Sequence, residues 1–298
     1  MTAFVRKPAE QPVLREDWHE NEDGSRLLLL KYPLLECTGI VEHCFTTRLG
    51  GGSTDIFSTM NLSFTRGDEE AAVRENYRRL ARALGAEVGQ FVCSDQTHTV
   101  NVRRVTAADA GKGLTRERDY RDVDGLITDE PGLVLSTFYA DCVPLYVVDP
   151  VHRAIGMSHS GWRGTAARMG AVTLSAMQEA YGTRPEDVVC AVGPSICRDC
   201  YEVSADVADI FAEEFPGHEQ EILAESEKNS VGMAHADKKY QLDLWKANEL
   251  VLTEAGIRPE HMAVTNVCTC CNPELLFSHR ASKGKRGNLA AFIALKEG

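Results

Sequence analysis

Apolar residues along this chain recur with two periods, and each period predicts one kind of element. Recurrence every three to four residues predicts amphipathic helices. They are expected between Asp68 and Gly85, over 169–180, after Ser204, and between Asp243 and Gly256, with the polar residue as cap and the glycine as stop. Short unbroken apolar runs that end in turn residues predict buried strands. The strands are expected within 126–139, on both sides of a Pro-Gly turn, and over 143–150, 154–158, 188–194 and 263–267.

The order of these elements predicts an α/β fold. Strands alternate with helices, but several strands follow one another directly, which indicates mixed sheets rather than a ladder of parallel βαβ units. There is no internal repeat and no low-complexity linker, so we expect one domain over 26–298 after a poorly ordered segment over 1–25. The polar stretch 111–122 and the acidic stretch 213–230 are expected to be exposed loops.

Composition narrows the classes of function. Of the 298 residues, 43% are hydrophobic, which is enough to bury a sizeable core. The net charge of -12 argues against a general nucleic-acid-binding protein, but small anions need only a local cluster of arginines and backbone N–H groups. No apolar run approaches the roughly 20 residues of a membrane span, and the first residues do not resemble a signal peptide. We therefore expect a cytoplasmic protein whose ten cysteines are thiols or ligands rather than disulfides.

Three predicted strand ends carry side chains that bind metals. His98 lies in SDQTHTV, Cys142 in YADCVP and His159 in GMSHSGW. Their wide, uneven separations do not match a zinc finger and suit ligands gathered from different strands of one sheet. Two imidazoles and one thiolate leave a fourth tetrahedral position open, as in catalytic zinc sites. From the residues alone, two alternatives stay open: a buried cysteine with two hydrogen-bonded histidines, or a Cys142 thiolate with His159 as its base.

Two glycine-rich segments with an arginine are candidates for binding an anion. In GWRG, the glycines allow close approach of the backbone, and Arg163 adds charge beside a helix start. TTRLGGGS offers Arg48 in the same way. A tight turn with an exposed arginine and a flexible hairpin tip are the simpler interpretations of these two segments. Asn61 in MNLSF could bind substrate or cap a turn.

A second group of cysteines lies towards the C-terminus, as Cys197-x-x-Cys200 and Cys268-x-Cys270-Cys271. Four or five thiols could hold a second zinc ion or an iron–sulfur cluster. The spacing looks irregular, however, and favours ordinary buried or redox-sensitive thiols.

Taken together, several segments resemble one known family. They are TTRLGGGS, MNLSF, SDQTHTVNV, DGLITDEPGLVLSTFYADCVPLYVVDP, HSGWRGT, GPSICRDCYEV and CTCCNPELLFSHR followed by GNLAAFIAL. In this order they resemble the bacterial laccase-domain family. That family was first named for multicopper polyphenol oxidoreductases and was later recognised as zinc-dependent purine nucleoside enzymes related to mammalian FAMIN.

The resemblance implies a fold, an activity and a set of residues. The fold is a four-layer α/β/β/α sandwich with mixed sheets, similar to that of cysteine hydrolases related to cytotoxic necrotizing factor. The activity is phosphorolysis of adenosine, inosine, guanosine and methylthioadenosine, with adenosine deamination as a further reaction, so purine nucleosides and phosphate are the expected partners. One Zn²⁺ per chain is implied, bound by His98, Cys142 and His159. For such a reaction, Arg48, Arg163 and the helix start after GWRG are our candidates for holding the phosphate. The full set of substrate-binding candidates is Arg48, Asn61, Gln96, Arg163 and Cys268.

The chain also departs from the family pattern. It has CTCC where CTYC is usual, which places Cys270 at an aromatic position, and His279 and Cys197 are further departures that affect the expected substrate preference. Multicopper oxidases need many histidines, largely paired as H-x-H, whereas this chain has nine histidines and no such pair. We therefore reject a multicopper site, although one copper could occupy the zinc position. A Cys–His hydrolase, a copper-dependent polyphenol oxidase and a non-enzymatic zinc or thiol redox protein are the alternatives.

Overall fold

The computed structural model describes residues 3–8, 13–230 and 233–297, and its strands form three sheets. The first sheet has the order β1-β2-β3-β15-β7-β4 and the second has the order β14-β10-β8-β9-β6-β5. The first comprises Arg15–Glu20, Arg26–Lys31, Val41–Thr46, Leu289–Leu295, Val134–Tyr139 and Phe91–Cys93. The second comprises Met262–Val264, Val189–Val192, Val143–Asp149, Ala154–Ser160, Gly125–Thr128 and Val102–Arg104. A small third sheet has the order β11-β13-β12, with strands Glu202–Ser204, Lys239–Leu242 and Leu223–Glu225.

Both large sheets are mixed, which confirms the predicted α/β class. β4 pairs with β7 in parallel, as do β5 with β6 and β10 with β14, whereas the remaining pairs are antiparallel. The two strands predicted around the Pro-Gly turn are β6 and β7. They do not form a hairpin, because β6 pairs with β9 of the second sheet and β7 pairs with β15 of the first.

The two large sheets pack face to face. The unbroken apolar runs in their strands occur because both faces of a strand are buried. Along β15, Leu289, Ala291 and Ile293 belong to the core between the sheets. The alternating residues Ala290 and Phe292 belong to a second core on the opposite face of the same strand. Because side chains alternate across a strand, a strand buried on both faces shows an unbroken apolar run rather than alternation.

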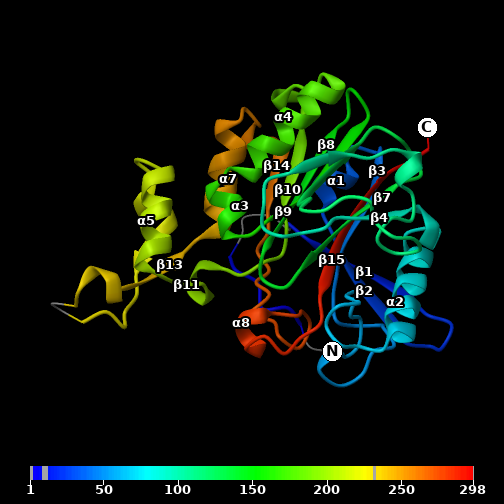
Figure 1. Cartoon of the computed structure of the whole chain (residues 1–298), viewed down its shortest axis with the longest axis horizontal. Helices are drawn as coiled ribbons and strands as arrows, with labels where there is room; N and C mark the ends of the chain where they lie inside the picture. Colours follow the sequence, from blue (N-terminus) through cyan, green and yellow to red (C-terminus); the bar gives the residue numbers. More distant parts are fainter. Residues whose placement is uncertain (1–2, 9–12, 231–232, 298) are drawn as a thin grey trace.

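The main helices cover the outer faces of the two sheets. α2 (Glu70–Ala83) packs its Val73, Tyr77 and Leu80 on the first sheet. α4 (Met169–Tyr181) and α7 (Leu244–Glu254) pack on the second sheet, at the other side of the molecule (Figure 1). The remaining helices are α1 Pro33–Glu36, α3 Trp162–Ala166, α5 Ala205–Glu214, α6 Glu219–Ile222 and α8 His279–Ser282. The short 3-10 segments are Asp55–Phe57, Val88–Gln90, Ala107–Asp109, Pro185–Asp187, Arg198–Cys200, His235–Asp237 and Pro259–His261.

The segment between β10 and α7 projects from this body. In Figure 1, α5 with β11 and β13 extends away from the two large sheets. The acidic stretch expected to be a loop over 213–230 lies here and instead contains α6 and β12. Among the described residues, no helix has the length and apolar character needed to cross a membrane.

Three local predictions need correction. The segment over 1–25 was expected to be poorly ordered, but β1 pairs along its whole length with β2, so the sheet begins at Arg15; residues 1–2 and 9–12 lie outside the described part. Asp68 does not cap α2, because its carboxylate accepts hydrogen bonds from Ser53 and Asn61. Ser204 stands at the start of α5 without a side-chain capping bond, whereas Asp243 does cap α7 by accepting from the Lys246 N–H at 3.0 Å.

Candidate metal centre

His98, Cys142 and His159 meet where the two large sheets adjoin. His98 follows β4 of the first sheet, Cys142 lies in the turn from β7 to β8, and His159 is on β9 of the second sheet. The ligands therefore come from both sheets, not from one sheet as predicted. One ligand atom from each residue lies within 4.8 Å of the others, and Cys142 Sγ is 3.9 Å from His98 Nε2.

These positions fit a single tetrahedral ion. Zinc binds imidazole nitrogen at about 2.0–2.1 Å and thiolate sulfur at about 2.3 Å, so two such ligands lie about 3.6 Å apart in a tetrahedral site. The observed 3.9 Å is within a few tenths of that separation. The chemistry of the donor set, two borderline nitrogens and one soft sulfur, also suits zinc or copper.

A buried carboxylate that the sequence analysis missed holds both histidines. Asp124 is fully buried immediately before β6 and accepts a hydrogen bond from the ring of His159 at Nδ1 (2.7 Å). The same carboxylate accepts the backbone N–H groups of Thr97, His98 and Thr99. These backbone hydrogen bonds stabilise an unusual conformation, because His98 has a φ of 68°, in the left-handed region that non-glycine residues seldom adopt. Asp124 thus fixes the backbone of one ligand and leaves Nε2 of the other free to bind a metal.

The charges at this centre favour a thiolate. Burial acts to raise the pKa of the Cys142 thiol, but the charge and hydrogen bond of His159 and the contact with His98 lower it to about 6. Burial acts to lower the pKa of His159, but the Cys142 thiolate and the Asp124 carboxylate raise it to about 9. A metal ion needs the thiolate and the neutral imidazole, so binding at this site would release the proton of His159.

Gly161, the first glycine of GWRG, is required by the closeness of the backbone to the ligands. A Cβ atom at this residue would lie 3.0 Å from His98 Cδ2 and 3.1 Å from Cys142 Sγ. Both contacts are shorter than ordinary van der Waals separations, so any side chain here would displace two ligands. The GWRG turn thus serves to bring the chain past the metal centre.

We expect Gly161→Ala to weaken metal binding by about tenfold, similar to the loss of a residue that orients a ligand. The matched control is Gly164→Ala in the same motif, where the nearest atom to the new Cβ is His159 O at 3.5 Å. A competition titration with zinc and a chromophoric chelator measures both affinities. Equal affinity in the two variants would show that the ligands are not held against Gly161.

The three ligands line a cleft of about 380 Å³. Gln96, Arg66, Arg118 and Arg286 lie on its walls. Arg118 comes from the polar stretch 111–122, which was expected to be only an exposed loop, and it is already engaged by Asp95 at 2.6 Å and by Ser94 O.

Arg286 differs from the other arginines of the cleft because it is buried without an acidic partner. Only 9% of it is exposed, and it donates from Nη1 to Gly287 O (3.2 Å) and to the side chain of Asn288. Within the part of the chain that the structure describes, its Nε has no hydrogen-bond acceptor and its guanidinium forms no ion pair with a carboxylate. Burial, with a smaller contribution from the charge of Arg66, lowers the pKa of Arg286 to about 10, and the more weakly acting charges of Asp141 and Cys142 only partly oppose this shift. A buried guanidinium of this kind favours binding of an anion.

Only Gln96, of the five predicted substrate-binding residues, lies on this cleft. Its side-chain amide pairs with both backbone groups of Phe138, at 2.8 and 2.7 Å, and so fixes the wall. Asn61 is fully buried and binds Asn288 N through its amide oxygen, which holds the segment that carries Arg286. We therefore interpret Asn61 as a positioning residue rather than a substrate ligand.

The other three predicted residues point elsewhere. Arg48 donates to Ser58 O and Pro273 O and lies over the Phe277 ring. Arg163 is exposed on α3 and stacks on Trp162, with 4.2 Å between its guanidinium carbon and the ring centre. Cys268 is fully buried among other cysteines. The expected roles of Arg48 and Arg163 in holding phosphate therefore do not match this cleft.

Comparison with known proteins places this site in a family. A family model described as multi-copper polyphenol oxidoreductase laccase matches residues 42–296. The chain belongs to this family. The resemblance seen in the sequence motifs is thus confirmed. Of the nine histidines, only His98 and His159 belong to a cluster of potential metal ligands among the described residues, so this member of the laccase family offers one imidazole-containing site for a metal ion.

Relatives within the laccase family have names that refer to another activity. "Purine nucleoside phosphorylase YlmD" of Bacillus subtilis is 35% identical over 257 residues, which are 85% of this chain and 88% of that protein. The human "Purine nucleoside phosphorylase LACC1" is 31% identical over 86% of this chain and 56% of its own length. The crystal structure of YlmD from Geobacillus stearothermophilus matches with a TM-score of 0.81 at 33% identity, covering 95% of this chain and 100% of that chain.

Proposed function

We propose that this protein is a zinc-dependent purine nucleoside phosphorylase. Its substrates would be adenosine, inosine, guanosine and methylthioadenosine, which react with phosphate to give the free base and the sugar 1-phosphate, and adenosine deamination would be a further activity. The observation that carries the proposal is one cleft that is lined both by His98, Cys142 and His159, which we call the ligand trio, and by Arg286, which is buried without an ion-pair partner among the described residues. The names of the relatives support the same reaction class.

In this proposal the residues of the cleft have three roles: binding the metal, orienting its ligands and binding phosphate. His98, Cys142 and His159 hold one zinc ion, which when bound would supply a Lewis acid next to the nucleoside. Asp124 keeps the two histidines in place through the hydrogen bonds described above. Arg286, on the wall of the cleft, binds the phosphate, because a bound anion accepts hydrogen bonds from the guanidinium and offsets its buried charge. A nucleoside and a phosphate that are held side by side lose less entropy on reaching the transition state, which is the main advantage of such a cleft.

The proposal predicts that inosine yields hypoxanthine only in the presence of inorganic phosphate. A chelator strong enough to remove zinc should abolish the release, and added zinc should restore it, because in this proposal the bound zinc supplies the Lewis acid. Chromatography of the bases, with and without phosphate, measures the outcome. Release at an equal rate without phosphate would contradict phosphorolysis. Restoration by copper but not by zinc would contradict the choice of metal.

A Cys–His hydrolase is the second candidate, because one observation favours it. Cys142 has a lowered pKa of about 6, and His159 is oriented by Asp124, so the three side chains also form a nucleophile, base and carboxylate series. We propose in addition that the arrangement of two helix layers around two sheets is the four-layer sandwich of the toxin-related cysteine hydrolases. Activity that survives metal removal but is lost on alkylation of Cys142 by iodoacetamide would favour this candidate over the phosphorylase.

A further inference from the structure

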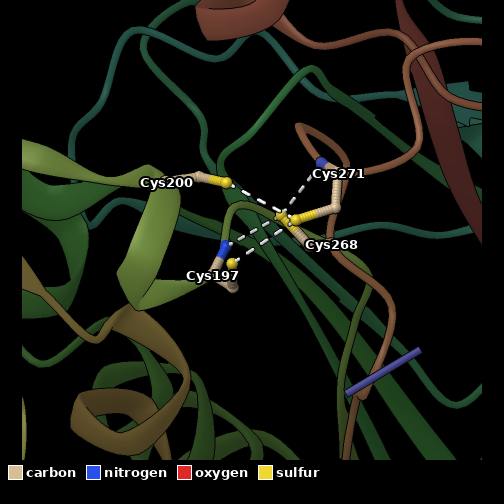
Figure 2. Close-up of side chains that lie close together, drawn as sticks. All are labelled: Cys197, Cys200, Cys268 and Cys271. Carbon is tan, nitrogen blue, oxygen red and sulfur yellow. Dashed lines mark hydrogen bonds between the residues drawn. The ribbon is translucent and has the colours of Figure 1, made fainter. Parts of the chain in front are cut away.

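A second group of sulfur atoms converges on one point outside the cleft. Four cysteine side chains point toward one another from two loops, as Figure 2 shows, and their Sγ atoms all lie within 4.8 Å of each other. One loop joins β10 to β11, and the other follows β14. The members of this four-cysteine cluster are Cys197, Cys200, Cys268 and Cys271.

The distances in the four-cysteine cluster match a single ion bound by thiolates. Zinc–sulfur bonds of about 2.3 Å in a tetrahedron place two sulfurs about 3.8 Å apart. Cys271 Sγ lies 3.5 Å from the sulfur of Cys200 and 3.9 Å from that of Cys197. These separations are far longer than a disulfide bond of about 2.05 Å. They are also too short for several irons and sulfides to fit between the thiolates.

The local sequence has the form of a zinc site. Cys197 and Cys200 are separated by two residues, and so are Cys268 and Cys271, which gives two C-x₂-C pairs. The backbone N–H groups of Cys197 and Cys271 both point at Cys268 Sγ, at 3.2 and 3.4 Å. Such N–H donors stabilise a thiolate and fix its orientation, as partners of metal ligands do.

The surroundings indicate a closed site rather than a reactive one. Cys268 is fully buried, Cys197 is 3% exposed, and the other two members are half-buried. All four tetrahedral positions are occupied by the protein, so none remains for water or substrate. Asp199 lies between Cys197 and Cys200 in the sequence, and its carboxylate forms an ion pair with Lys7 Nζ at 2.6 Å. Lys7 thus adds a positive charge beside the thiolates.

We propose that the four-cysteine cluster holds a second zinc ion, in a closed four-thiolate site with a structural role. The ion joins the two loops to each other. Both loops also bind Asp141, the residue before Cys142: Ile196 N donates to its carbonyl at 3.0 Å, and Thr269 Oγ1 donates to its carboxylate at 2.6 Å. The second zinc thus helps to position the turn that carries a ligand of the first.

The number of bound metal ions tests this assignment without reference to activity. Protein purified with reduced thiols should contain two zinc ions per chain by plasma mass spectrometry, and Cys142→Ala should retain one. Cys197→Ser should lose the ion of the four-cysteine cluster. Cys270→Ser is the matched control, because this neighbouring thiol is not a member of the cluster, and it should retain both ions.

Spectroscopy identifies the ligands even if Cys197→Ser folds poorly. Cys142→Ala reconstituted with cobalt should show the intense visible bands and charge-transfer absorption of a tetrahedral four-thiolate ion. Cys142→Ala with no bound metal, or wild-type protein with two disulfides at these cysteines after purification with reductant, would overturn the proposal. Stoichiometric iron in place of zinc would overturn the choice of metal. Absence of nucleoside phosphorolysis would leave these readouts unchanged and would count only against the proposed function.

The structural role has its own readout. We expect Cys197→Ser to melt roughly 10 °C below wild type, because a structural metal contributes directly to folding, whereas Cys270→Ser should melt near wild type. Cys197→Ser should also bind the remaining zinc more weakly, by a few-fold, through the contacts of the loops with Asp141. Unchanged melting and unchanged affinity at His98, Cys142 and His159 in a variant that has lost one zinc would show that the second ion does not position the first site.

Discussion

Cys142→Ala should lose one zinc ion per chain and reduce phosphorolysis by more than about 100-fold. Loss of a residue that merely orients a ligand costs about 10–100-fold in metal affinity, and loss of the ligand itself costs more. Cys142 supplies the only sulfur of the ligand trio, and the two imidazoles that remain form a much weaker site. Metal analysis and the hypoxanthine assay measure the two effects.

The control for this variant is Cys37→Ala, which removes an exposed thiol that belongs to neither cluster of potential metal ligands among the described residues. It should keep both its zinc content and its activity. A circular dichroism spectrum like that of wild type would establish that Cys142→Ala is folded. Full metal content with full turnover in Cys142→Ala would rule out the ligand trio as the catalytic metal centre.

Arg286→Gln should raise the KM for phosphate roughly ten- to a hundredfold while zinc content stays normal. The lost interaction is a charge-assisted hydrogen bond to phosphate, which contributes about 1.5–3 kcal/mol. Glutamine is neutral but can still donate to Gly287 O, which keeps the local backbone contact. Adenosine deamination, which uses no phosphate, should change much less.

Arg163→Gln is the matched control for the phosphate experiment. Arg163 is the arginine of the GWRG motif, yet it is exposed and stacks on Trp162 away from the cleft. Its KM for phosphate should equal that of wild type. An elevated KM for phosphate in Arg163→Gln with no change in Arg286→Gln would contradict the role of Arg286. It would show instead that phosphate binds at the start of α3, as the GWRG motif alone had predicted.

The cysteines illustrate a signal that was present in the sequence but obscured. Cys268 and Cys271 form a C-x₂-C pair, but Cys270 lies between them and makes the spacing look irregular. Neighbouring side chains in a turn can point in opposite directions. A run of cysteines in the sequence therefore does not reveal which of their thiols lie close enough together to share a metal ion. The structure separates them: Cys268 and Cys271 face the other pair, and Cys270 is not part of the cluster.

The anion site shows a different limit of sequence reasoning. Arg48 and Arg163 lie in glycine-rich motifs that resemble anion-binding loops, whereas Arg286 lies in an ordinary polar stretch, KGKRGN. What distinguishes Arg286 is its burial without a carboxylate partner, and that depends on chain segments far away in sequence, such as the loop of Asn61 that binds Asn288. A motif reports local backbone geometry, but the cost of burying a charge is set by tertiary surroundings.

The sequence by itself predicted the strands β6–β10 and β14, the main helices and the three candidate metal ligands. Apolar runs and turn residues are local patterns, and the histidines and the cysteine stand at the strand ends that these patterns define. Only the tertiary structure decided that β6 and β7 belong to different sheets and that the ligands come from both. It also decided that Asp124 orients His159. The physical reason is that strand pairing and burial depend on contacts between distant segments, and the period of side chains along a single strand contains no information about its neighbours.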